Sequence, residues 1–180
     1  LDGQVGGKMY SHSHHKMTEQ GKLAHTLNGR LPGTDFYMSK DDPRIATAGL
    51  SPQDGMYMIA PGVVKNDDGS FSKNTKVVTV ESYYKEFYRM ANVETNTFST
   101  DFLKLREMRL EYKLPGSTLK KTPFSKASIA FYARNLFCIT DYPLFDPESA
   151  ALNGSSMVTG VETGSLLTAR TFGLNINLSF

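Results

Sequence analysis

The sequence predicts an all-β chain that contributes four strands to an antiparallel transmembrane β-barrel with long extracellular loops. One observation is the end of the chain, where residues 171–180 alternate strictly between polar and apolar side chains and finish on Phe180. A second is that no stretch approaches the roughly 20 consecutive apolar residues that a membrane-spanning helix needs. Barrel strands escape that requirement, because only every second residue of each strand faces lipid.

The final run has the period of two that is typical of a strand with one apolar face. Its apolar positions are Phe172, Leu174, Ile176, Leu178 and Phe180. Ten residues at about 3.3 Å each span roughly 33 Å, enough to cross a bilayer core at a tilt. In barrel families a terminal aromatic residue on such a strand belongs to the signal read by the assembly machinery. We therefore expect that signal at Phe180, Leu178, Ile176 and Phe172; the alternative for Phe180 is a chance hydrophobic terminus.

Alternation elsewhere predicts three further strands, and the irregular stretches between them predict the connections. The four strands are expected at about 1–10, 102–114, 125–137 and 170–180. If Phe180 ends at the periplasmic side, the short turn 115–124 is periplasmic and the long segments 11–100 and 138–167 are extracellular loops. Bacterial single-chain barrels need at least about eight strands, so four cannot close a barrel. The remaining strands are expected outside this chain.

The strand expected at 102–114 changes phase along its length. Leu103 and Leu105 occupy odd positions, whereas Met108 and Leu110 occupy even ones. A β-bulge near Arg106 would keep all four on one face.

Charged residues gather on the other face of these strands, where hydrocarbon would be costly. The candidate lumen-lining residues are Arg106, Arg109, Glu111 and Arg134, with Glu107 and Lys126 of the same kind. Three interpretations of these residues remain open: they line a wet lumen, they face bulk water on a soluble sheet, or they pair with one another across strands.

The long first loop contains one helical pattern, at 82–90. Tyr84, Phe87 and Tyr88 fall on one face at helical spacing. Together with Tyr83 they are candidate contacts for substrate or for a partner protein, since aromatic residues often anchor interfaces. Internal packing of the loop is the equal alternative.

Other patterns in the sequence give weaker evidence for a functional site. A metal site at His12, His14, His15 and His25 is weighed against a solvated loop, and the loop is favoured. A calcium loop around 66–69 lacks two of its strongest ligands, so a turn is favoured. A net charge of +2 without a basic stripe argues against nucleic acid. A single cysteine, Cys138, excludes an internal disulfide. No catalytic motif is present, so neither an enzyme nor a cofactor is expected.

Several segments resemble the SusC/RagA family of TonB-dependent transporters, in the family's order. They are FLKLREMRLEYKLP at 102–115, YARNLF at 132–137, DYPLFDPE at 141–148 and RTFGLNINLSF at 170–180, with shorter matches at 6–11 and 26–30. Ala133 and Leu144 each stand where the family usually has glycine.

The resemblance implies that this chain is the last four strands of a 22-stranded barrel with an N-terminal plug. It implies TonB-driven import of glycans, oligosaccharides or peptides across the outer membrane of Bacteroidetes, beneath a SusD-like lipoprotein. The plug and the TonB-contacting segment would lie outside this chain. Two other readings stay open: a passive outer-membrane porin or small ligand-binding barrel, and a soluble β-rich binding module.

Overall fold

The computed structural model describes all residues except 54, 145, 149–150, 154–155 and 165–167, and leaves aside the side chains of 151–153 and 156–157. The chain is built mostly of strands, with few helices. It divides into two compact units, Leu1–Met9 with Phe98–Phe180 (unit 1) and Tyr10–Thr97 (unit 2).

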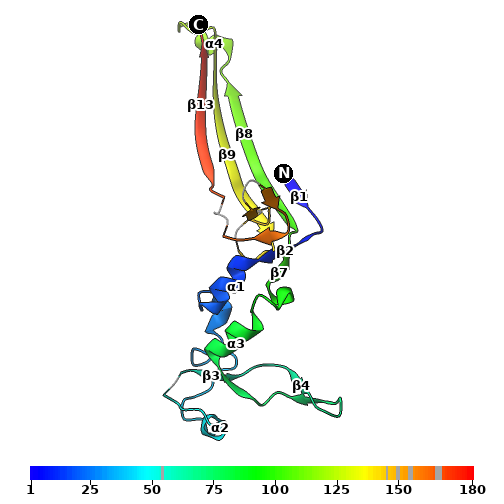
Figure 1. Ribbon diagram of the computed structural model, residues 1–180. Helices are drawn as coiled ribbons and strands as arrows, with labels where there is room; N and C mark the ends of the chain where they lie inside the picture. The colour runs from blue at the N-terminus through cyan, green and yellow to red at the C-terminus, as the bar shows by residue number, and fades with distance from the viewer. Residues whose placement is uncertain (54, 145, 149–150, 154–155, 165–167) are drawn as a thin grey trace. The chain divides into compact units, whose positions relative to one another are not determined.

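Unit 1 is organised around a four-stranded antiparallel sheet in the order β1-β8-β9-β13. Its strands are β1 (Asp2–Gln4), β8 (Phe102–Lys113), β9 (Lys126–Thr140) and β13 (Thr171–Ser179). The last three lie side by side in Figure 1. Among the described residues the sheet stays open and closes into no barrel.

The expected bulge is present, at the step between Leu105 and Glu107. Leu105 pairs with Phe137, and Glu107 pairs with Arg134. One residue, Arg106, separates Leu105 from Glu107 on β8, whereas Asn135 and Leu136 separate their partners on β9. Asn135 adopts a positive φ of 53°, the left-handed conformation that asparagine tolerates better than most residues. Two residues of β9 thus oppose one residue of β8, so the irregularity lies beside Arg106, with the extra residue on β9.

The single strand expected at 1–10 is wrong. The structure has two short strands there, β1 (Asp2–Gln4) and β2 (Lys8–Ser11). Gly6 and Gly7, with φ of 89° and 95°, separate them, and such angles break extended backbone.

Unit 1 has two further connections, one after β8 and one after β9. The turn after β8 contains α4 (Gly116–Leu119). The segment after β9 contains a hairpin of β10 (Ala151–Asn153) and β11 (Ser156–Val158), followed by β12 (Val161–Glu162). Strand β12 forms a small sheet with β2 and β7 (Thr97–Ser99), in the order β12-β2-β7.

Unit 2 is a folded insertion, not the irregular loop expected over 11–100. Its helices are α1 (His12–Glu19), α2 (Pro43–Thr47) and α3 (Val80–Phe87), with 3-10 turns η1 (Ala24–Leu27) and η2 (Val93–Asn96). Its hairpins pair β3 (Tyr57–Ile59) with β6 (Val77–Thr79), and β4 (Val63–Lys65) with β5 (Phe71–Lys73). The Thr79 side chain caps α3 by accepting a hydrogen bond from the Ser82 N–H.

Two small hydrophobic clusters hold unit 2 together. One contains Met38, Ile45, Tyr57 and Val77, and the other contains Met58, Val80 and Tyr84. Their members come from segments that are distant in sequence, which is why alternation along the chain did not reveal them.

Candidate functional site

The four-stranded sheet of unit 1 has two chemically different faces. Residues that pair directly across antiparallel strands point to the same face. The register therefore aligns Tyr112, Ile129 and Ile176 in one row. The neighbouring row on that face consists of Leu110, Phe131 and Leu174.

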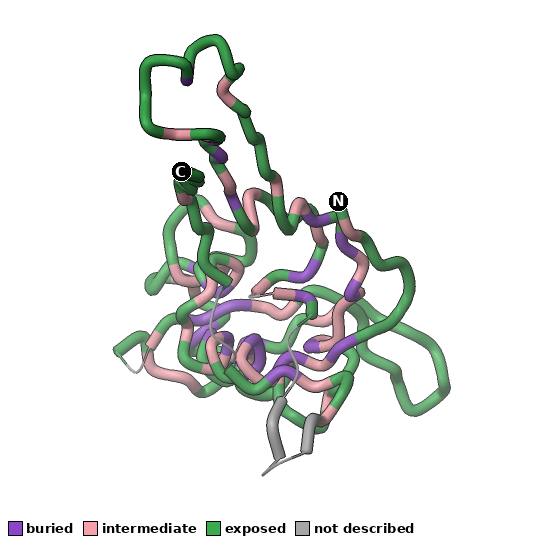
Figure 2. The backbone as a smooth tube through the Cα atoms, turned by 90° about the horizontal axis from the view of Figure 1, so that it is seen from above, coloured by how far each residue is buried: buried purple, intermediate pink, exposed green. Residues whose placement is uncertain are grey.

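This apolar face is uncovered. Leu110 and Leu174 are each 63% exposed and Ile176 is 57% exposed. The exposed apolar residues of this face also include Leu103, Tyr112, Ile129, Phe131, Phe137, Ile139, Phe172 and Leu178. Figure 2 shows the tube exposed where it runs into the C-terminus. An apolar patch that spans three strands is larger than a soluble monomer usually leaves in water.

The opposite face is polar, and the candidate lumen-lining residues lie on it, largely paired with one another. Arg134 lies 3.6 Å from Glu107, its direct cross-strand partner. Arg109 lies 3.3 Å from Glu111, which also accepts a 2.8 Å hydrogen bond from the Ser128 hydroxyl. These charges are therefore largely balanced within the sheet.

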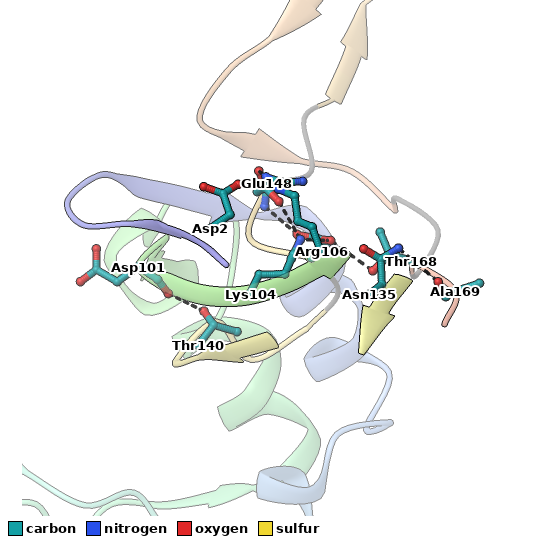
Figure 3. A network of polar contacts seen from close by, with 10 residues as sticks. Asp2, Asp101, Lys104, Arg106, Asn135, Thr140, Glu148, Thr168 and Ala169 are labelled. Carbon is teal, nitrogen blue, oxygen red and sulfur yellow. Dashed lines mark hydrogen bonds and ion pairs between the residues drawn. The ribbon is translucent and has the colours of Figure 1, made fainter. Parts of the chain in front are cut away.

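A buried ion cluster lies at the end of this face where β8 begins (Figure 3). The Lys104 ammonium donates to both carboxylate oxygens of Asp146, at 2.8 and 2.7 Å, and to Glu148 at 2.6 Å. Lys104 is only 3% exposed. Burial alone would raise the pKa of Asp146, but the hydrogen bonds from Lys104 and from the Glu148 N–H lower it.

Arg106 extends this cluster across the sheet, pairing with Asp2 on β1 and with Glu148. The Thr168 hydroxyl donates to Asp146 at 3.2 Å. The cluster thus ties β1, β8, the segment after β9 and the segment before β13 together. The sequence did not predict this cluster, because 42 residues separate Lys104 from Asp146. The one nearby indication of it is that Lys104 is a charged residue between two leucines.

The expected assembly-signal residues lie on β13 and at the chain end. Phe172, Ile176 and Leu178 belong to the uncovered face, at 61%, 57% and 47% exposure. Phe180 is 87% exposed, and its ring centroid lies 5.1 Å from that of Phe124.

The four aromatic candidates of unit 2 divide into two pairs. Tyr84 is buried, and its hydroxyl donates to the backbone oxygens of His25 and Asn28 at 2.7 and 3.2 Å. Burial, with smaller contributions from Tyr83 and Tyr88, raises the pKa of Tyr84 to about 12.

The other pair is more accessible. Tyr83 and Phe87 stack with centroids 5.4 Å apart. They line a pocket of about 600 Å³ that also holds Lys76, Glu86 and Arg89. Internal packing therefore accounts for Tyr84 and, through its stacking on His25, for Tyr88. Tyr83 also packs partly against the cluster of Met58, Val80 and Tyr84, whereas Phe87 is 45% exposed and remains available for contacts.

The expectation of solvated histidines is wrong for two of the four. His14 and His15 are 6% and 2% exposed. His14 stacks on His25 at 5.2 Å, and its Nδ1 lies 2.9 Å from Asn96 Oδ1. Burial lowers the pKa of His14, with a smaller contribution from the charge of His15 and against the hydrogen bond with Asn96; burial and the charge of His14 lower the pKa of His25. Among the described residues, no three His, Cys, Asp or Glu side chains gather as metal ligands would.

The segment 66–69 forms a hairpin turn. The Asn66 N–H donates to the Ser70 oxygen at 2.8 Å, and Asp68 accepts hydrogen bonds from both the Ser70 N–H and its hydroxyl. Asp68 is thus used within the turn.

Comparison with known proteins gives a partial match. No family model matches the chain. The chain is similar to TonB-dependent receptor P3 of Formosa agariphila (strain DSM 15362 / KCTC 12365 / LMG 23005 / KMM 3901 / M-2Alg 35-1), with 30% identity over 87 residues. The match covers 46% of this chain and 9% of that protein. No helix in the described part of the chain is long and apolar enough to cross a membrane. The similarity supports a relationship of this chain to the TonB-dependent receptors.

Proposed function

We propose that this chain forms four neighbouring wall strands of a TonB-dependent outer-membrane importer of the SusC/RagA kind. The apolar face of the sheet contacts lipid, and the polar face lines the water-filled interior. The observation that carries this proposal is the contrast between the faces: isoleucines, leucines and phenylalanines lie uncovered on one, and ion pairs cover the other. A sheet in water would expose the second face and cover the first.

The finer features of the proposal draw on the resemblance. The complete barrel has 22 strands and an N-terminal plug, and it imports glycans, oligosaccharides or peptides in Bacteroidetes with energy delivered through TonB. A SusD-like lipoprotein captures the substrate at the cell surface. The chain then has a role in transport and not in catalysis. Its similarity to a TonB-dependent receptor favours this role.

In this proposal the end of β13 is periplasmic. Phe180, Leu178, Ile176 and Phe172 serve as the assembly signal, and unit 2 is extracellular. The stacked pair Tyr83 and Phe87 is the part of unit 2 that we assign to contacts with substrate or with the lipoprotein, because it lines a pocket and Phe87 is 45% exposed. Arg106, Arg109, Glu111 and Arg134 line the interior as ion-paired wall residues.

A matched pair of substitutions on β13 tests the lipid-facing assignment. Ile176 and Asn175 are neighbours on opposite faces, paired with Ile129 and Ala130 respectively. In the full-length protein folded into lipid vesicles, Ile176→Arg should destabilise the barrel by up to about 2–4 kcal/mol, the cost of arginine facing the bilayer midplane. Asn175→Arg should cost much less, because its side chain points to the interior. Equal effects in urea unfolding would contradict the assignment.

Two further measurements separate the importer from its alternatives. Recovery of the full-length protein in the soluble periplasmic fraction would refute the membrane assignment and favour a binding module. Uptake that continues unchanged in cells lacking TonB would favour a passive porin. We expect the protein in the outer-membrane fraction and uptake that depends on TonB.

A further inference from the structure

Phe36 of unit 2 has a backbone conformation that aromatic residues rarely adopt. Its φ is 64°, and it occupies the third position of a turn in which the Tyr37 N–H donates to the Thr34 oxygen at 3.3 Å. Glycine or asparagine normally occupies that position, because most residues with a Cβ are strained there. The Phe36 side chain is also 45% exposed, so it adds little to the core of unit 2. Strain of this kind is common at ligand-binding sites, and core packing does not explain it here.

Phe36 lines a pocket of about 470 Å³ within unit 2. The rest of the lining is largely apolar and includes Tyr37, Met38, Ile59 and Pro61. The polar lining residues are Arg44, Lys73, Asn74 and Thr75. A pocket of this size, mostly apolar with a few polar groups, is typical of sites that bind small molecules or single units of a larger ligand.

This pocket carries one positive charge that no neighbouring carboxylate balances. The Arg44 guanidinium donates from Nε and Nη2 to the two carboxylate oxygens of Asp42, at 2.9 and 2.6 Å, so its charge is compensated. Lys73 pairs across the β4–β5 hairpin with Val63, and no Asp or Glu among the described residues lines the pocket. A ligand in the pocket would therefore gain from a negative group placed near the Lys73 ammonium.

The pocket that contains Phe87 adjoins this one. Ala60 lines both pockets, and the consecutive residues Thr75 and Lys76 line one each. The charged residues of the second pocket are Lys76, Glu86 and Arg89, which leave it too with one positive charge in excess. Unit 2 therefore has two neighbouring pockets, each with an exposed phenylalanine and an excess of positive charge.

The two pockets together restrict the chemistry of the ligand. Because ring and charge recur side by side, the ligand is a chain with repeated units and repeated negative groups. Hydroxyl groups lie near each ring, those of Thr75 in the first pocket and Ser82 in the second. A sugar ring fits such surroundings, because its C–H faces are apolar and its rim carries hydroxyl groups that donate and accept hydrogen bonds.

We propose that the two pockets bind an acidic oligosaccharide, with sugar rings against Phe36 and Phe87 and carboxylate or sulfate groups at Lys73 and Lys76. This inference rests on the proposed function, since it names the class of substrate that unit 2 captures at the cell surface. The strained turn at Phe36 serves to hold the ring at the pocket.

Isothermal titration calorimetry of the full-length protein in detergent micelles tests the class of ligand. The probes are hexagalacturonate, its fully methyl-esterified form, a sulfated hexasaccharide and hexaglutamate. We expect binding of hexagalacturonate or of the sulfated sugar, whichever group the site takes, and we expect it to weaken as salt screens the charges. The neutral ester and the acidic peptide should bind much more weakly. Equal binding of the ester, preference for the peptide, or no binding of either acidic sugar would overturn the proposal.

Substitutions in the first pocket locate the site. Lys73→Gln should weaken binding about tenfold, as expected for loss of a hydrogen bond to a charged group. Lys65→Gln is the matched control, because Lys65 lies on the same face of the same hairpin but outside the pocket. Unchanged affinity in Lys73→Gln, or an equal loss in Lys65→Gln, would overturn the proposal.

Phe36→Gly separates a binding role from a structural one. It should weaken binding while unit 2 resists protease as well as before or better, because glycine adopts a φ of 64° freely. Unchanged affinity, or lower protease resistance, would overturn the role of Phe36. A protein that binds no acidic sugar but still fractionates with the outer membrane and imports through TonB would leave the proposed function standing. Loss of that fractionation would refute the function itself.

Discussion

Replacement of Lys104 by methionine should release the segment that follows β9. Methionine keeps an unbranched apolar stem of similar length but removes the ammonium that donates to Asp146 and Glu148. The Asp146 carboxylate would then remain in a site where its side chain is 9% exposed. The hydrogen bonds from the Thr168 hydroxyl and from the Glu148 N–H would remain, but neither brings a positive charge to the carboxylate.

The expected magnitude follows from the burial of both partners. The side chains of Lys104 and Asp146 are 4% and 9% exposed, so solvent screens the pair little. Removing one partner of a buried pair costs about 3–5 kcal/mol. At about 1.4 kcal/mol for each tenfold change, the lower figure makes local opening of this segment roughly a hundredfold more frequent.

Hydrogen exchange of the segment 141–148, in the full-length protein, measures that opening. The amides of Tyr142 and Glu148 report directly, because they donate to Thr140 Oγ1 and to Asp146 Oδ1 at 3.1 Å each. Lys104→Met should speed the exchange of both amides. Adding Asp146→Leu should restore part of the protection of the Tyr142 amide, because it removes the buried carboxylate that has lost the Lys104 ammonium. The Glu148 amide loses its acceptor in the double variant and reports on Lys104→Met alone.

Arg134→Met is the matched control, since its pair with Glu107 is more than half exposed on both sides and lies outside the cluster. Exchange that stays at the wild-type rate in Lys104→Met, or that rises equally in Arg134→Met, would refute the view that Lys104 holds this segment.

Three further outcomes are expected. Deletion of Phe180, which is 87% exposed, should lower the amount of full-length protein in the outer membrane; unchanged surface levels in a blot would count against an assembly role. Unit 2 should lose stability as the pH falls below about 6.5, the ordinary pKa of His14 and His25, because their folded pKa values are lowered and the unfolded chain binds protons first. Limited proteolysis across that pH range measures the loss, and a variant with glutamine at both positions should show a flatter profile. Asn135→Val should cost about 1–2 kcal/mol more than Asn135→Gly in urea unfolding, because only glycine accepts a φ of 53° freely and both changes lose the hydrogen bond to the Ala169 oxygen.

Short-range alternation anticipated much of unit 1. The expected runs at 102–114 and 170–180 compare with β8 at Phe102–Lys113 and β13 at Thr171–Ser179. The phase change also located the bulge. These features depend on which side of a strand each residue faces, and a period of two encodes that directly.

What sequence reasoning missed depends on contacts between distant residues. Lys104 looks like one more charge on a polar face until the segment after β9 folds onto it. The burial of His14 likewise comes from Asn96 and Tyr88, which are more than seventy residues away along the chain. The break in the first strand is different, because it depends on adjacent residues: Gly6 and Gly7 adopt positive φ angles that end the extended backbone.

The points where the chain leaves unit 1 and returns to it lie next to each other. The Thr100 N–H donates to the Gly7 oxygen at 3.2 Å, and the Gly6 N–H donates to the Asp101 carboxylate at 2.5 Å. The 88 residues Tyr10–Thr97 therefore begin and end beside hydrogen-bonded residues of unit 1. Excision with a short splice, or exchange for a foreign module of another size, would leave the strands on either side in register. The same arrangement allows unit 2 to change in size or sequence during evolution while the four-stranded sheet of unit 1 stays the same.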